Sequence, residues 1–358
     1  MGDLAVEDAH RLLESVNYRV QSISRIREGL GHFVFDVSLS GGEKIIAKFE
    51  NNSRLSKDGV RKDFSFNSEL SLEREGYTAD LLRKAGLPSP LSLIHQAEGK
   101  RFIVQQKMPG KVWCEYVKEN DFKITPFLKS LEHLGADEAE TQRLKFSSYG
   151  NITPEGIKPK GITSFEKRLQ QILKFKLVRA EEKKALTKKE LKSIQNYFWS
   201  SVNSLILPTD VLFIFSDLHP NNFLVDMDGK PSGYFDLEHC QAGPPVLDVY
   251  HHKLHLFNYF DENTFEKALE AYFRGYHNNG GNYEFNDPTN KNLENVLSAG
   301  FMMGCITAYH QVRDGLRDDW SDKFKELLFQ SLSNKNIPYD SIADIFRQKT
   351  KQPKYPNP

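Results

Sequence analysis

The sequence predicts an α+β protein of two lobes, a β-rich lobe followed by a larger, mainly helical lobe. Its 358 residues exceed one ordinary domain of about 150 residues. The first 110 residues carry strand and turn patterns, whereas helical periodicity dominates the rest, apart from strands expected over 211–236. We expect an N-terminal lobe at 1–107, a C-terminal lobe at 108–347, and an unstructured, proline-containing tail at 348–358.

The composition indicates an ordinary globular protein without a charge-selected partner. Lysine and arginine together number 48, as do aspartate and glutamate, and 39% of the residues are hydrophobic. These values exclude a disordered chain, a collagen and a coiled coil. The N-terminus is acidic, unlike a signal peptide, and no uncharged apolar stretch reaches the roughly 18 residues of a membrane span. We expect a cytoplasmic protein that binds neither membrane nor nucleic acid.

One basic segment leaves an alternative open. Residues 174–192 contain eight basic and three acidic residues. Such a run occurs on nucleic-acid-binding faces, but the segment has few aromatic residues, which favours an exposed charged helix. Binding of nucleic acid with a steep salt dependence would support the alternative.

The first lobe is expected to contain a hairpin, a helix and a further strand. Val34–Leu39 and Lys44–Glu50 alternate apolar and polar residues around a Ser-Gly-Gly turn. A helix is expected over Asn67–Ala85. Its apolar stripe is Leu72, Ala79 and Leu82, and Gly86 and Pro88 end it. The strand Arg101–Gln106 then leads to Met108-Pro109-Gly110, where the lobe is expected to end.

The segment 213–250 contains the candidate catalytic and metal-binding residues. An Asp-Gly turn separates the expected strands Phe223–Asp226 and Gly233–Phe235, which predicts a hairpin. Folding this hairpin about its glycine sets Asn222 opposite Asp236. One amide oxygen and one carboxylate are ligands that suit Mg²⁺, which keeps several waters and bridges to substrate phosphates.

A third polar residue completes the pattern. Asp217 lies five residues before Asn222, on the turn after the expected strand 211–215, where it is able to accept a proton from a hydroxyl. Any one aspartate here is typical of an ordinary turn. The joint placement of Asp217, Asn222 and Asp236 around one hairpin favours catalysis.

The motifs SDLHPNNFLVD and YFDLEHCQAGPPVLD resemble those of the aminoglycoside phosphotransferase family of small-molecule kinases. The resemblance implies a protein-kinase-like bilobal fold, with a small β-rich N-lobe containing one helix and a mainly helical C-lobe. It also implies that Asp217 is the catalytic base, that Asn222 and Asp236 bind magnesium, and that Asp248 supports the catalytic loop. Phe215 departs from the family pattern, which has His there, so we expect altered packing and retained chemistry.

The resemblance extends to residues that would bind the nucleotide. Those in the first lobe and the hinge are Gly29, Gly31, Lys48, Glu75, Gln106 and Met108. Lys48 resembles the lysine that contacts the α and β phosphates, and Glu75 the helix glutamate that positions it. Physical chemistry supports Glu75 independently, since a carboxylate on the apolar stripe of a helix is costly unless it is paired.

The family implies an ATP-dependent enzyme that transfers the γ-phosphate to a hydroxyl of a small molecule, with Mg²⁺ as cofactor. Glu238 and the acids Asp314, Asp318 and Asp319 favour a cationic acceptor, such as an aminoglycoside or amino alcohol. A protein kinase is disfavoured, because only eleven residues separate Asp236 from Asp248. The alternative from another class is a catalytically inactive, nucleotide-binding scaffold.

Overall fold

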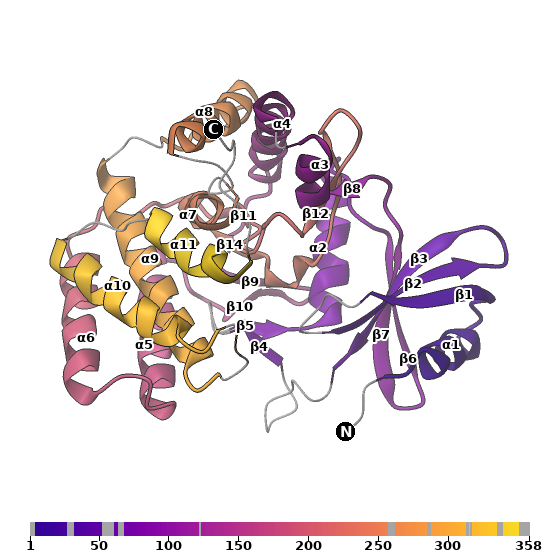
Figure 1. Cartoon of the computed structure of the whole chain (residues 1–358), viewed down its shortest axis with the longest axis horizontal. Coiled ribbons are helices and arrows are strands. Elements are labelled where there is room, and N and C mark those ends of the chain that lie inside the picture. Colours follow the sequence, from indigo (N-terminus) through magenta and orange to yellow (C-terminus); the bar gives the residue numbers. More distant parts are fainter. Residues whose placement is uncertain are drawn as a thin grey trace.

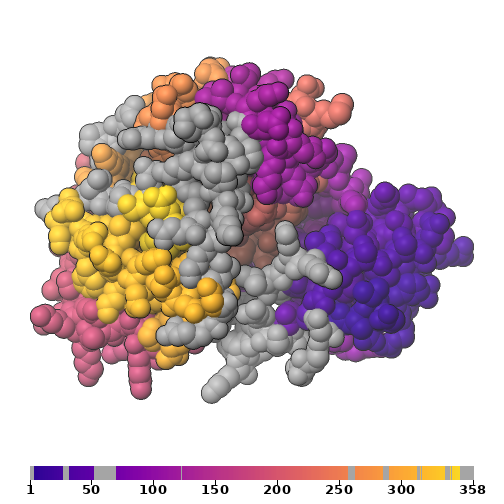
Figure 2. Space-filling view, in the orientation of Figure 1, coloured from indigo at the N-terminus to yellow at the C-terminus, as the bar shows by residue number. Residues whose placement is uncertain are grey.

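The computed structural model of the chain is a mixed α+β structure, with a β-rich N-terminal part beside a larger helical part (Figure 1). The space-filling view shows these two parts as neighbouring masses of unequal size (Figure 2). The structure describes residues 4–26, 32–51, 61–63, 68–121, 123–256, 262–284, 288–312, 315, 317–334 and 339–350.

A five-stranded antiparallel sheet forms the N-terminal part. Its strands, in spatial order, are β1 (Val20–Ile26), β2 (His32–Leu39), β3 (Lys44–Glu50), β7 (Lys100–Gln106) and β6 (Ser92–Ala97). The predicted strand over residues 44–50 is confirmed at both ends, and the prediction for 34–39 falls within β2. Alternation of apolar and polar residues in β2 gives a strand with one face on the core.

One helix of this part was not predicted from the sequence. Helix α1 (Val6–Ser15) covers one face of the sheet, at the right of Figure 1. Its apolar residues Leu12 and Leu13 are buried in a separate N-terminal core with the aromatic rings of the sheet. Within that core the rings of Phe49 and Phe102 stack with centroids 4.6 Å apart. Burial of this stripe, more than helix propensity, stabilises so short a helix.

Helix α2 (Leu72–Lys84) joins the two parts. Ser71 caps it by accepting a hydrogen bond from the Arg74 N–H, so the helix begins five residues later than predicted. Residues 68–70 instead form strand β5 (Ser68–Leu70), which pairs with β4 (Arg61–Asp63). The expected stripe is confirmed, because the members at 72, 75, 79 and 82 are all fully buried.

The C-terminal part is mainly helical, and its helices surround one large apolar core. They are α3 (Trp113–Glu119), α4 (Ile124–Thr141), α5 (Phe165–Glu182), α6 (Lys188–Val202), α7 (Val246–His255), α8 (Glu262–Asn278), α9 (Pro288–Tyr309), α10 (Trp320–Asn334) and α11 (Tyr339–Thr350), with a 3₁₀ turn, η2 (Leu237–His239). Helix α11 continues three residues into the predicted tail. None of the helices in the described ranges is long and apolar enough to cross a bilayer.

Short strands between these helices position the polar segment. They are β8 (Lys111–Val112), β9 (Gly150–Thr153), β10 (Gly156–Lys158), β11 (Leu212–Ile214), β12 (Phe223–Val225), β13 (Pro231–Tyr234) and β14 (Gln241–Gly243). One sheet has the order β13-β12-β8 and another the order β10-β9-β14-β11. The strands expected over 211–236 are present, whereas the hairpin of β9 and β10 was not predicted.

Helices α4 and α8 lie side by side, at the top of Figure 1, and glycines allow them to approach closely. A Cβ atom added at Gly275 would overlap the backbone carbonyl of Glu132, and one added at Gly135 would overlap that of Tyr272. Backbone groups cannot move aside as a flexible side chain does. The glycines are therefore required by packing rather than by backbone conformation.

We expect Gly275→Ala to lower the free energy of unfolding by about 3 kcal/mol, the upper range for overpacking a core. Urea denaturation monitored by circular dichroism measures the effect. Gly41→Ala is the matched control, because a Cβ at that position would meet no atom within 4 Å, and its effect should stay within about 0.5 kcal/mol. Equal stability of the two variants would contradict this account of the α4–α8 contact.

Candidate active site

The hairpin of β12 and β13 brings Asn222 close to Asp236, but not in the predicted register. Phe223 pairs with Tyr234, so Asn222 lies opposite Phe235, whose N–H donates to the Asn222 carbonyl at 3.1 Å. The predicted pairing of Asn222 with Asp236 is wrong by one residue. Asp236 follows this last pair in the left-handed region, at φ 59°, a conformation that aspartate tolerates better than most residues.

The turn of the hairpin explains the shift. The Asp226 carboxylate accepts hydrogen bonds from the N–H groups of Asp228 and Lys230, at 2.9 and 3.0 Å. These bonds centre the turn on Asp228 instead of on the following glycine. This centre shifts the pairing by two residues from the predicted register, and a bulge on the β13 side shifts it back by one residue.

The loop that carries Asp217 is held by a buried carboxylate. Asp248, in the first turn of α7, accepts hydrogen bonds from the N–H groups of Phe215 and Ser216, at 3.0 and 2.8 Å. Ser216 has a φ of 65°, and its hydroxyl accepts a further bond from Gln241. These three bonds offset the cost of a left-handed serine and fix the backbone directly before Asp217.

Burial is the main influence on Asp248. Desolvation raises its pKa to about 7, with a smaller contribution in the same direction from the Glu138 carboxylate. His252, which is buried with its Nε2 2.5 Å from Glu138, acts in the opposite direction on Asp248. The carboxyl that supports the loop therefore belongs to a buried network that reaches α4.

Asn222 and Asp217 are linked through the loop backbone. The Asn222 amide nitrogen donates to the Asp217 carbonyl at 2.9 Å. Because the nitrogen is used in this bond, the amide oxygen is directed elsewhere and is the atom that suits a cation. Asn222 is buried, whereas the Asp217 side chain is 35% exposed and open to a substrate.

Lys48, Glu75 and Asp236 form a chain of charges across the two parts of the molecule. Lys48 Nζ lies 2.5 Å from Glu75 Oε1 and 3.3 Å from Asp236 Oδ1. Lys48 is on β3, Glu75 on α2 and Asp236 after β13. Lys48 and Glu75 are both buried. Lys48 is therefore not an exposed lysine on the polar face of an amphipathic strand. The sequence-predicted pair is thus brought together with a metal-ligand candidate.

The charges in this chain stabilise one another. Burial alone would lower the pKa of the Lys48 ammonium, but Glu75 and Asp236 outweigh it and hold that pKa above its ordinary value. Burial would likewise raise the pKa of Asp236, and the positive potential of Lys48, His239 and His32 holds it below its ordinary value instead. Both groups are therefore charged at neutral pH.

Arg74 fixes the helix that carries Glu75. Its buried guanidinium donates to the carbonyl of Ile152 at 3.1 Å and to that of Cys240 at 2.8 Å. Ile152 is on β9, and Cys240 directly precedes β14, the strand that follows the candidate metal-binding loop. This residue was not predicted as part of the site, although a basic residue next to a buried glutamate on a helix was the available signal.

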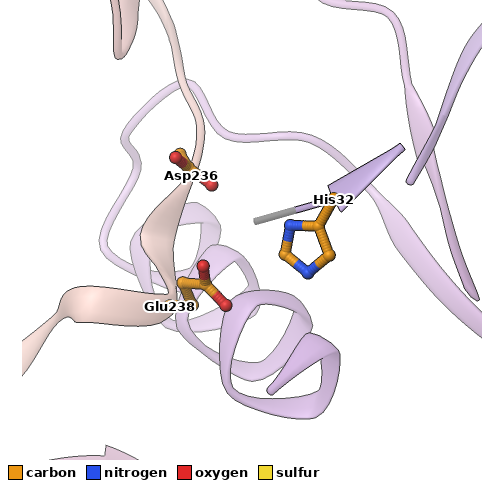
Figure 3. A group of neighbouring side chains, drawn as sticks. All are labelled: His32, Asp236 and Glu238. Atoms are coloured by element: carbon orange, nitrogen blue, oxygen red, sulfur yellow. The ribbon is translucent and has the colours of Figure 1, made fainter. Parts of the chain in front are cut away.

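Two imidazoles near the carboxylates were also missed. His239 Nε2 lies 3.9 Å from Asp217 Oδ2 and 4.0 Å from Glu238 Oε1. His32, at the start of β2, faces Asp236 and Glu238 across the space between the two parts (Figure 3). The position of His32 directly after a glycine-containing loop was the only sequence signal for it.

The remaining predicted nucleotide-binding residues differ in what the structure shows of them. Gly29 and Gly31 lie outside the described residues. The Gln106 N–H donates to the Leu91 carbonyl at 2.9 Å, so this donor is already used within the fold. Met108 follows β7 and is partly exposed.

Comparison with known proteins is consistent with this geometry. The sequence model of the phosphotransferase enzyme family, APH, matches residues 23–287. No curated protein sequence is detectably similar to the chain.

Several solved structures share the fold. Amicoumacin kinase hAmiN, in complex with AMP-PNP, Ca²⁺ and Ami, has a TM-score of 0.60 and 14% identity, over 93% of this chain and 96% of that one. The gentamicin complex of APH(2")-IIa has a TM-score of 0.58 and 12% identity, over 96% and 99%. A putative fructosamine-3-kinase from Thermobifida fusca YX-ER1 has a TM-score of 0.55 and 15% identity, over 96% and 100%. At these identities the likeness is one of fold, and the protein-kinase-like α+β fold is confirmed.

We expect Glu75→Gln to lower the free energy of unfolding by about 3 kcal/mol, because it removes one partner of a buried ion pair and leaves the ammonium undercompensated. Glu73→Gln is the matched control on the same helix. Glu73 pairs with Arg101 at a partly exposed position, where such pairs contribute at most about 1 kcal/mol. Chemical denaturation of both variants measures the difference, and a smaller effect for Glu75→Gln than for the control would refute the assigned role.

Proposed function

The chain belongs to the phosphotransferase enzyme family, and from this premise we propose that it transfers the γ-phosphate of ATP to a hydroxyl group of a small molecule. The observation that carries the proposal is the chain from Lys48 to Glu75 and Asp236, which lies beside a loop that presents Asp217. A cation-binding carboxylate, a phosphate-binding ammonium and an exposed carboxylate are the groups that phosphoryl transfer requires.

In the proposed reaction Asp217 accepts the proton of the acceptor hydroxyl as its oxygen attacks the γ-phosphorus. The bonds from Phe215 and Ser216 to Asp248 fix the loop that presents the carboxylate, and His239 lies within 3.9 Å of it. General-base catalysis contributes about 10²- to 10⁴-fold, so positioning and charge neutralisation must supply the rest. Lys48, held by Glu75, supplies a fixed positive charge for the phosphates.

The residues present suit the magnesium ion that the family implies. Asn222 offers an amide oxygen and Asp236 a carboxylate, both hard oxygen ligands, and Asp236 is ionised. Bound there, the ion would neutralise negative charge on the β and γ phosphates. We assign Asn222 and Asp236 to this site.

For the acceptor we propose a small hydroxyl-bearing molecule with a positive charge, such as an aminoglycoside or amino alcohol. The support is the excess of carboxylates in the segment 217–248, which holds six acidic residues and one basic residue. Glu238 is almost fully buried beside Asp236, a less open position than direct acceptor binding requires. Asp318 accepts from the Gly315 N–H, Asp319 pairs with Lys323 at 2.8 Å, and Asp314 lies outside the described residues.

The short segment between Asp236 and Asp248 argues against a protein substrate. In the structure this segment forms η2 and then β14, which pairs with both β9 and β11. A segment held between two strands is not available to rearrange as a regulated activation loop does. The second candidate, an inactive nucleotide-binding scaffold, is disfavoured by the complete set of five polar residues: Lys48, Glu75, Asp217, Asn222 and Asp236.

We expect Asp217→Asn to lower kcat by about 10²- to 10⁴-fold while leaving ATP affinity unchanged, because the base acts only in the chemical step. An ADP-release assay against aminoglycosides, amino alcohols, sugars and nucleosides identifies the acceptor, with this variant as the blank. ATP binding without acceptor-dependent ADP release from any of these classes would favour the scaffold.

We expect Asp236→Ala to lower kcat at least as much as Asp217→Asn, and not to be rescued by high magnesium, because charge neutralisation contributes more than the base. Initial rates over a magnesium titration measure this. Asp228→Ala, at an exposed position in the turn of the same hairpin, is the control and should keep kcat within about twofold of the parent. Near-normal turnover of Asp236→Ala at saturating magnesium would show the metal assignment to be wrong.

A further inference from the structure

Three side chains from the two parts of the molecule converge beside the proposed active site. Ligand atoms of His32, Asp236 and Glu238 all lie within 4.8 Å of one another. His32 reaches the group from β2 of the N-terminal sheet, and the two carboxylates belong to the segment after β13 (Figure 3). Within the described residues, no other group of three or more His, Cys, Asp or Glu side chains is close enough together to hold a metal ion.

The charges of this group are compatible with binding of a cation. Two carboxylates held close together repel each other, and burial of His32 and Glu238 removes the water that would screen them. Lys48 lies 3.3 Å from Asp236 Oδ1, but it also lies 2.5 Å from Glu75, so its single positive charge is shared between two carboxylates. His239 Nε2 also lies 4.0 Å from Glu238 Oε1, and a divalent cation at the centre of the group would add positive charge next to both carboxylates.

We propose that His32, Asp236 and Glu238 bind a divalent transition-metal cation of the Mn²⁺ or Zn²⁺ class, at a site that requires no nucleotide. One imidazole nitrogen and two carboxylate oxygens suit such cations, whereas Mg²⁺ prefers oxygen ligands alone. Donor atoms about 2.1 Å from a cation lie about 3 Å apart when adjacent and about 4.2 Å apart when opposite. Ligand atoms that all lie within 4.8 Å of one another are thus close to the spacing of cation ligands.

This site differs from the proposed magnesium site in its ligands and in its consequence. It shares Asp236 but does not use Asn222, and it adds a ligand from the N-terminal sheet. A cation bound to His32 and Glu238 joins β2 to the segment after β13, which lie in different parts of the molecule. Its binding free energy therefore adds to the stability of the arrangement in which the two parts meet.

The test is a Mn²⁺ titration of the nucleotide-free, full-length chain, with free Mn²⁺ measured by electron paramagnetic resonance. We expect one bound ion that tenfold excess Mg²⁺ does not displace. His32→Gln and Glu238→Gln, which keep the size and polarity of the side chains, should each weaken binding at least about tenfold. His10→Gln, on α1 away from the group, is the matched control and should bind as the parent does.

Asn222→Ala separates this proposal from the proposed function. It should keep nucleotide-free Mn²⁺ binding and lose magnesium-dependent ADP release. The proposal is overturned if the parent chain binds neither Mn²⁺ nor Zn²⁺, if equimolar Mg²⁺ displaces Mn²⁺, or if both His32→Gln and Glu238→Gln bind as the parent does. These three binding results are independent of kinase activity, because the metal titrations contain no nucleotide or acceptor.

Discussion

The buried contact between Lys48 and Glu75 is the interaction on which the rest of the site depends. Glu75 is fully buried, and an ionised carboxylate in that position is costly by several kcal/mol unless a cation meets it. Lys48 meets it at 2.5 Å and also lies near Asp236. A strand of the N-terminal sheet and the helix that joins the two parts must therefore pack together before the charge of Glu75 is compensated. The loop after β13 then brings Asp236 to the same ammonium group.

Arg74 adds a second constraint, because its guanidinium donates hydrogen bonds to backbone carbonyl groups. Its bonds to the carbonyls of Ile152 and Cys240 connect the helix to the β9–β10 hairpin and to the residue directly before β14. Because that strand lies between β9 and β11, the loop has little freedom to move. These hydrogen bonds therefore hold the candidate metal-binding loop against the helix that carries Glu75.

Local features were predictable from the sequence, and features that depend on tertiary contacts were not. The limits of β3 and the buried stripe of α2 follow from the periodicity of apolar residues. Helix α1 is stabilised by burial against the sheet, and the register of Asn222 is set by the side chain of Asp226 in the turn. No periodic pattern reports such contacts. The approach of His32 to Glu238 joins residues about 200 positions apart, which no local motif encodes.

The neutral composition of the chain conceals an acidic site, and this bears on the order of binding. A nucleoside triphosphate is a polyanion, yet the segment from Asp217 to Asp248 contains six carboxylates. Asp248 accepts hydrogen bonds from backbone N–H groups, and Asp236 lies 3.3 Å from Lys48. His239 Nε2 lies 3.9 Å from Asp217 and 4.0 Å from Glu238. Lys48, Lys230 and the two nearby imidazoles together carry less positive charge than this segment and a nucleoside triphosphate carry negative charge. In the proposed reaction the nucleotide would therefore enter with a cation or meet one already bound, which would couple metal and nucleotide affinities.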